Sequence, residues 1–112
     1  MQVSTEQRGP LHRLRLEGDL DIYAAADLKT ALVDALSTTH ELEIDLAQIS
    51  AIDTSGIQLL AAAKREASDT GKTMRMVNHS AAVVELIELY DLAGWFGDPL
   101  WLPQASQNGG TA

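Results

Sequence analysis

The stretch ELEIDL at residues 41–46 alternates acidic and apolar side chains without a break. This two-residue period is typical of a β-strand, whose successive side chains point to opposite faces of a sheet. A strand that is covered on both faces carries a nearly continuous apolar run instead. The sequence therefore predicts a sheet with one packed face and one wet face. On the wet face we expect Glu41, Glu43 and Asp45 to be solvated rather than to bind a divalent cation.

Strand and helix patterns alternate on both sides of this stretch. Two-residue spacing predicts strands over residues 11–16 and 73–77, the first ending at a turn over residues 17–19. Apolar residues three or four apart predict helices over residues 22–36, about 56–68, and from 81 onward, with Asp21 and Ser80 as N-caps of the first and third. This order predicts an α/β fold with partly parallel strands and with the helices on the packed face.

Length and charge restrict the class of protein further. A chain of 112 residues makes one domain, and we expect an ordered part over residues 11–102 between flexible ends at 1–10 and 103–112. The net charge of -8, with scattered basic residues, argues against nucleic-acid binding. The apolar stretches are shorter than the roughly 20 residues of a membrane span, and no signal peptide or Cys is present, so we expect a cytoplasmic protein without membrane insertion.

The stretch IDTSGI at residues 52–57 lies between the alternating strand and the second predicted helix. Ser55 and Gln58 have the S-x-x-Q spacing of a capping box, in which the serine hydroxyl caps the helix and the glutamine side chain returns to the cap amide. In that interpretation Asp53 is a favourable charge beside the helix, and Gly56 allows a tight entry from the loop. Such a box is sufficient to explain the motif without any further function.

A capping box leaves the hydroxyl of Thr54 free, one residue outside the helix. Unpaired backbone N–H groups at a helix start favour a bound phosphate. Phosphorylation would add about -1.5 to -2 charge beside Asp53, Asp19 and Asp21, and so change which partner binds. The motif therefore also fits a modification site.

Three segments together resemble the STAS domain of the anti-sigma factor antagonist family: Gly18-Asp19-Leu20-Asp21 after a strand, Ile44-Asp45-Leu46, and residues 52–56. The resemblance covers about residues 11–100. It implies a single STAS-like domain with a four- to five-stranded mixed sheet and three helices on one face. No amphipathic pattern follows Trp101, so the fourth, C-terminal helix of many members is not expected here.

The resemblance also implies a function: a non-enzymatic switch in which a GHKL-type anti-sigma kinase binds the unphosphorylated protein and phosphorylates Thr54, or less favourably Ser55, and a PP2C-type phosphatase reverses the modification. The partner-binding surface that it implies consists of Asp19, Asp21, Asp53, Thr54, Ser55, Gly56 and Gln58. Two alternatives stay open. The chain could be an adaptor on the ATPase of an Mla-type phospholipid ABC transporter, or an adaptor of a chemotaxis or histidine-kinase system.

Other candidate sites are weaker. His12, His40 and His79 lack the spacing of a metal site, and no cofactor is predicted. Ser55 lacks the G-x-S-x-G context of a hydrolase nucleophile, so catalysis is not expected. Large aromatic residues near the C-terminus favour core packing over a partner-binding patch, although both are open: Trp95, Phe96 and Trp101.

Overall fold

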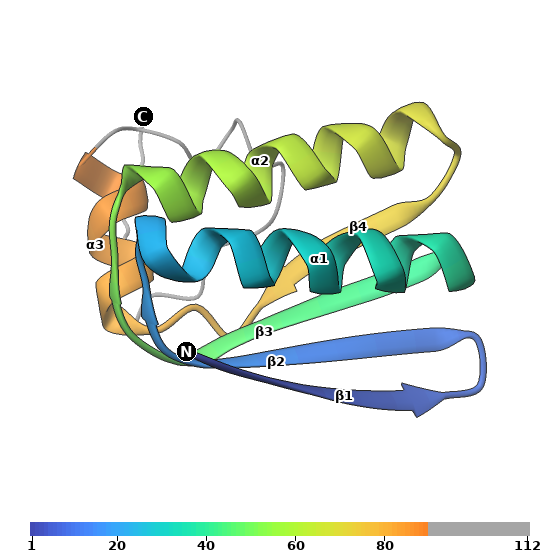
Figure 1. The fold of residues 1–112 in the computed structure, drawn as a ribbon, viewed down its shortest axis with the longest axis horizontal. Helices are drawn as coiled ribbons and strands as arrows, with labels where there is room; N and C mark the ends of the chain where they lie inside the picture. The colour runs from blue at the N-terminus through green and yellow to red at the C-terminus, as the bar shows by residue number, and fades with distance from the viewer. Residues whose placement is uncertain (90–112) are drawn as a thin grey trace.

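The computed structural model describes residues 1–89, which form one four-stranded sheet and three helices (Figure 1). The strand order is β1-β2-β3-β4, with β1 antiparallel to β2 and with β2, β3 and β4 mutually parallel. The mixed α/β fold predicted from the sequence is confirmed. The elements are β1 (Gln2–Arg8), β2 (Leu11–Leu20), α1 (Ile22–Thr38), β3 (Glu41–Ile52), α2 (Thr54–Asp69), β4 (Thr73–Val77) and α3 (Ala81–Leu89).

The helices pack on one face of the sheet, as the sequence predicted. In Figure 1, α1 and α2 lie side by side above β2, β3 and β4, and α3 lies at one end of the sheet, where it contacts β3. The hydroxyl of Ser80 accepts the Val83 amide at 3.3 Å, which confirms the predicted cap of α3. No helix within residues 1–89 is long and apolar enough to cross a membrane. The core between the layers includes Leu14, Leu16, Leu28, Leu32, Leu42, Ile44, Leu60, Met74, Met76, Val83 and Ile87.

Two strands are longer than their sequence patterns indicate. β3 continues to Ile52, and β2 continues to Leu20 through the predicted turn at residues 17–19, so that turn is wrong. Gly18 adopts a φ of 110°, and the pairing with β3 shifts register on both sides of it. Residues 15–20 of β2 pair with residues 45–52 of β3, so the extra residues of these irregularities lie on β3. Gly18 lies opposite them with a positive φ that glycine adopts without strain, and β2 continues to Leu20.

The expectation of a flexible N-terminus over residues 1–10 is also wrong. Residues Gln2–Arg8 form β1, which pairs along its length with residues 11–17 of β2. The hairpin turns at Gly9, whose φ is 58°. Backbone pairing and the partly buried Val3 hold this polar edge strand, so no apolar alternation marks it in the sequence. The predicted tail at 103–112, the three C-terminal aromatics and the absent fourth helix lie outside the described residues.

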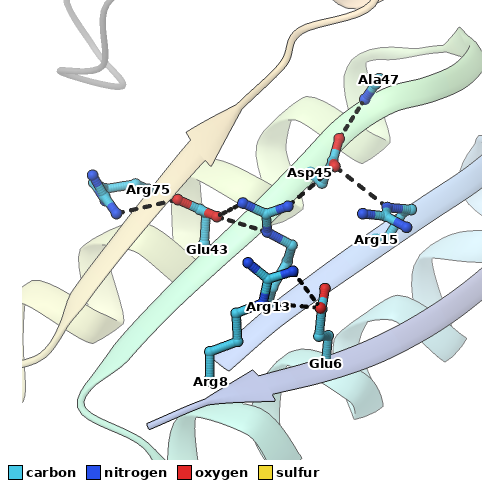
Figure 2. Close-up of polar contacts among 8 residues, drawn as sticks. All are labelled: Glu6, Arg8, Arg13, Arg15, Glu43, Asp45, Ala47 and Arg75. Carbon is cyan, nitrogen blue, oxygen red and sulfur yellow. Dashed lines mark hydrogen bonds and ion pairs between the residues drawn. The ribbon is translucent and has the colours of Figure 1, made fainter. Parts of the chain in front are cut away.

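The open face of the sheet is covered by paired charges rather than by water alone. Glu43 and Asp45 are only 7% and 4% exposed, so the expectation that they are solvated is wrong. Figure 2 shows the reason: arginines on the neighbouring strands lie over both carboxylates. Arg13 Nε donates to Glu43 at 2.7 Å, and Arg75 donates to the other oxygen of Glu43 at 3.1 Å.

These charges follow the strand register. Glu6 of β1, Arg13 of β2, Glu43 of β3 and Arg75 of β4 are successive register partners, so charge alternates across all four strands. We call this row the charge ladder. The hydrogen bond with Glu43 raises the pKa of Arg13. At the edge, the hydrogen bond from Arg8 lowers the pKa of Glu6, whose side chain is 41% exposed. Four of the five arginines in the chain contribute to this face.

Removal of the central carboxylate of the ladder should destabilise the fold. Glu43→Ala leaves two arginines without their acidic partner, and we expect a loss of about 1–3 kcal/mol in the free energy of unfolding, measured by urea denaturation. This range lies below that of a fully buried pair, because the side chains of Arg13 and Arg75 are 28% and 54% exposed. The matched control is Glu41→Ala at an exposed position of the same strand, with a change below about 0.5 kcal/mol. Equal effects of the two variants would contradict the role of the ladder.

Candidate functional site

Strands β2 and β3 end side by side, and the loops that follow them form one corner of the molecule. Leu20 and Ile52 are the last register partners of the two parallel strands, and the Asp53 amide donates to the Leu20 carbonyl at 3.2 Å. Helices α1 and α2 therefore begin next to each other, as Figure 1 shows. We call residues 19–23 and 53–58 the carboxyl-end corner. All seven residues predicted for the partner-binding surface lie in it.

Each of the two helices is capped by an aspartate. Asp21 Oδ1 accepts the amides of Tyr23 and Ala24, both at 3.0 Å, which confirms the predicted cap of α1. Asp53 Oδ1 accepts the amides of Ser55 at 2.9 Å and Gly56 at 3.3 Å. Both aspartates have the extended backbone that is usual at an N-cap.

The predicted capping box of Ser55 and Gln58 is therefore wrong. α2 begins at Thr54, so Ser55 is already its second residue, and its amide is bound by the Asp53 carboxylate. The bond from the Asp53 amide to Leu20 fixes the chain before Thr54 and places the Asp53 side chain over the helix start. Ser55 is half-buried, whereas Gln58 is exposed on the next turn.

Thr54 is the first residue of α2 rather than a residue outside it. Its side chain is exposed, and within residues 1–89 its hydroxyl makes no hydrogen bond. A phosphate on this hydroxyl would not find the Ser55 and Gly56 amides unpaired, because the Asp53 carboxylate already accepts from both. In the unmodified chain these two amides are therefore not available to a phosphate as the sequence analysis expected. The added charge would lie at the surface beside a carboxylate.

Gly56 is required by a close approach between α2 and the end of β2. It is buried, and a Cβ at this position would lie 2.6 Å from Leu20 Cγ and 3.0 Å from the Leu20 carbonyl oxygen. The glycine is inside the helix, so the predicted tight entry from the loop is not its function. Its missing side chain lets α2 lie directly on β2.

The corner also contains exposed apolar side chains that the sequence pattern did not single out. Ile22 and Tyr23 are 64% and 88% exposed. The buried stripe of α1 begins after them, at Ala24 and Leu28. The exposure of this pair could have been predicted from the sequence through the Asp21 cap. That cap assigns Ile22 and Tyr23 to the first turn of α1, before the buried stripe begins.

Comparison with known proteins identifies the class. The family model described as "Mlab, STAS domain" matches residues 3–102, and the chain therefore belongs to the STAS domain family. The match begins inside β1, in agreement with the place of that strand in the sheet. The resemblance predicted from the motifs is confirmed.

The individual relatives have low sequence identity to this chain, and several of them are named as anti-sigma factor antagonists. An anti-sigma-B factor antagonist of Staphylococcus epidermidis is 22% identical over 93 residues, which cover 82% of this chain and 86% of the relative. The crystal structure of an anti-sigma factor antagonist from Mycobacterium paratuberculosis has a TM-score of 0.78 at 21% identity, covering 93% of this chain and 89% of that one. The Bacillus cell fate determinant SpoIIAA in its phosphorylated form has a TM-score of 0.64 at 20% identity, covering 88% and 92%. At these identities the two structures show a shared fold.

The identity of the α2 cap can be tested by stability. Asp53→Ala removes the acceptor of two backbone amides, and we expect a loss of about 1 kcal/mol in urea denaturation. Ser55→Ala should cost less than about 0.5 kcal/mol, because the serine hydroxyl caps nothing. Asp53→Asn keeps a capping oxygen and should retain most of the stability while it removes the charge. A larger loss of stability for Ser55→Ala than for Asp53→Ala would show instead that Ser55 caps the helix, as in the predicted capping box.

The close approach at Gly56 gives a second stability prediction. Gly56→Ala should lower the free energy of unfolding by about 1–3 kcal/mol through the clash with Leu20, although alanine is the better helix former. The control is Ala62→Ser at an exposed position of α2, with an expected change below about 0.5 kcal/mol. Combining Gly56→Ala with Leu20→Ala should cost less than the sum of the single changes, because the clashing side-chain atoms of Leu20 are gone and only its carbonyl oxygen stays close. Simple additivity would show that the two residues do not clash.

Proposed function

We propose that this chain is a cytoplasmic anti-sigma factor antagonist whose carboxyl-end corner binds a GHKL-type anti-sigma kinase and is switched by phosphorylation of Thr54. The observation that carries the proposal is the Thr54 hydroxyl, exposed at the first residue of α2 with no hydrogen bond in the described chain. The antagonist names of a relative and of a structural neighbour with the same fold support it.

The chemistry of the transfer suggests how the switch works. The kinase transfers the γ-phosphoryl group of ATP to Thr54 Oγ1, the hydroxyl proton is lost to a base of the kinase, and ADP remains. For this transfer the hydroxyl must lie in line with the γ-phosphate of the bound nucleotide. After transfer, the phosphate on Thr54 adds about -1.5 to -2 charge and faces the phosphates of the nucleotide. Like charges at short range then favour dissociation, and a PP2C-type phosphatase restores the binding form.

Because the start of α2 is already capped, a phosphate on Thr54 would lie exposed at the surface rather than be bound by the backbone amides of the helix. The amides of Ser55 and Gly56 are held by the Asp53 carboxylate, and the neighbouring cap, Asp21, is also acidic. The corner has no Lys, Arg or His to neutralise a phosphate, since its sequence is Asp-Leu-Asp-Ile-Tyr over 19–23 and Asp-Thr-Ser-Gly-Ile-Gln over 53–58. The modified corner therefore presents its full added charge to a partner.

A second candidate function is favoured by the description of the matching family, which names Mlab. In that case the chain would be an adaptor on the ATPase of an Mla-type phospholipid ABC transporter. The same corner would bind its partner constitutively, and Thr54 would make contacts without being modified.

Intact-mass measurement after incubation with the kinase-type anti-sigma factor of the same cell and ATP tests the proposal. We expect one phosphate on the wild type, none on Thr54→Ala and one on the matched control Ser55→Ala. Thr54→Glu should bind the ADP-loaded kinase at least about tenfold more weakly, equivalent to about 1.4 kcal/mol. Modification of Thr54→Ala to the wild-type level would exclude Thr54 as the acceptor. Co-purification from cells with a transporter ATPase, and no phosphate on the wild type, would favour the adaptor.

A further inference from the structure

The carboxyl-end corner presents two large apolar side chains to solvent. Ile22 and Tyr23 are 64% and 88% exposed, and the Tyr23 hydroxyl has no hydrogen bond within residues 1–89. The other exposed large apolar residues of that part of the chain are separated from one another in sequence: Met1, Val33 and Leu89. Among the described residues, Ile22 and Tyr23 are therefore the one pair of exposed large apolar residues that are adjacent in sequence.

The fold holds this pair rigidly. The Tyr23 amide donates to the Asp21 carboxylate, and the following residue, Ala24, donates to the same oxygen and begins the buried stripe of α1. The backbone of residues 22–23 is thus fixed before any partner arrives. A tyrosine on a fixed backbone has only two side-chain torsions left to order, so it gives a large contact area at a low entropic cost.

The pair lies beside the candidate phosphorylation site. The bond from the Asp53 amide to the Leu20 carbonyl ties the residue before Thr54 to the residue before the Asp21 cap. The contact of Gly56 with Leu20 then keeps the first turn of α2 against the same strand end. The start of α1, which carries the pair, therefore lies next to the start of α2, which carries Thr54 (Figure 1).

The charge of the corner indicates the chemistry of the partner. Asp19 and Asp21 come just before the apolar pair in the chain, the amide of Asp53 is bonded to the Leu20 carbonyl, and the corner contains no basic residue. An apolar centre with an acidic rim is complementary to an apolar pocket rimmed by Lys and Arg. A second copy of this chain does not offer such a surface at its own corner, because the same acidic groups would face each other.

We propose that Ile22 and Tyr23 are the apolar anchors of the interface, inserting into a pocket rimmed by basic residues on the anti-sigma kinase. This inference rests on the function proposed above. The two sites have different roles. Ile22 and Tyr23 determine the affinity of the complex, and phosphorylation of Thr54 determines whether the complex dissociates. A buried tyrosine at the centre of an interface is a common hot spot, whereas exposed positions outside it contribute little.

Calorimetric titration with the ADP-loaded kinase that phosphorylates Thr54 tests the anchors. We expect Tyr23→Ser to raise Kd at least tenfold and Ile22→Ser at least fivefold, while Tyr23→Phe stays within threefold of wild type. The control is Val33→Ser, which changes an exposed apolar residue of the same helix. It lies about 15 Å further along α1 than Tyr23, and should change Kd less than twofold. Raising the salt concentration should weaken wild-type binding, as expected for a basic rim.

Kinetics separate an anchor from a merely structural residue. Tyr23→Ser should raise the KM of the kinase for this protein and leave kcat within twofold, with an unchanged midpoint of thermal unfolding. An unchanged Kd and KM for Tyr23→Ser, with normal phosphorylation of Thr54, would disprove the anchor role of the pair and leave the proposed switch intact. If no kinase phosphorylates the wild type, the anchor role and the proposed switch are both disproved.

Crosslinking in cells tests the identity of the occupant. A photoreactive benzoylphenylalanine at position 23 should form an adduct with the kinase, and this adduct should be lost when Thr54→Glu is added. The same group at position 33 should give no kinase adduct. An adduct of position 23 with a transporter ATPase, or with a second copy of this chain, would overturn the proposal.

Discussion

The parallel pairing of β2 with β3 up to Leu20 and Ile52 is the constraint on which the corner depends. Because both strands end at the same level, both following helices start there, and the hydrogen bond from the Asp53 amide to the Leu20 carbonyl fixes their relative position. The absence of a side chain at Gly56 then lets α2 rest on Leu20. The caps, the exposed Thr54 hydroxyl and the apolar pair at 22–23 are all placed by this junction.

The capping aspartates have two functions that cannot be separated by simple truncation. Asp53 organises the start of α2 through two amides, and it also keeps a negative charge beside Thr54. A surface that binds partners is thus stabilised by the same groups that give it its charge. The corner is preformed in the unbound chain, so binding does not require its backbone to be ordered first.

Elements with a clear period could be predicted from the sequence, and those that depend on tertiary neighbours could not. β4 was predicted to the residue, because Thr73–Val77 alternates and is bounded by turn formers. β1 was missed because a polar edge strand held by backbone pairing has no apolar period. The cap of α2 was misassigned because Asp53 and Ser55 both suit an N-cap, and the deciding bond to Leu20 comes from a residue that precedes Asp53 by a whole helix and strand. The burial of Glu43 depends on Arg13, which lies 30 residues away in sequence.

The charge ladder restricts how such a sequence can change over time. Glu43 contacts arginines on both neighbouring strands, so a substitution at this position leaves two partners unmatched in segments that are remote in the sequence. A reversal of its sign would need compensating changes at Arg13 and Arg75 together, and the intermediate sequences would be less stable. Positions 13, 43 and 75 should therefore be inherited as one unit, while the apolar face of the same strands can exchange one aliphatic residue for another independently.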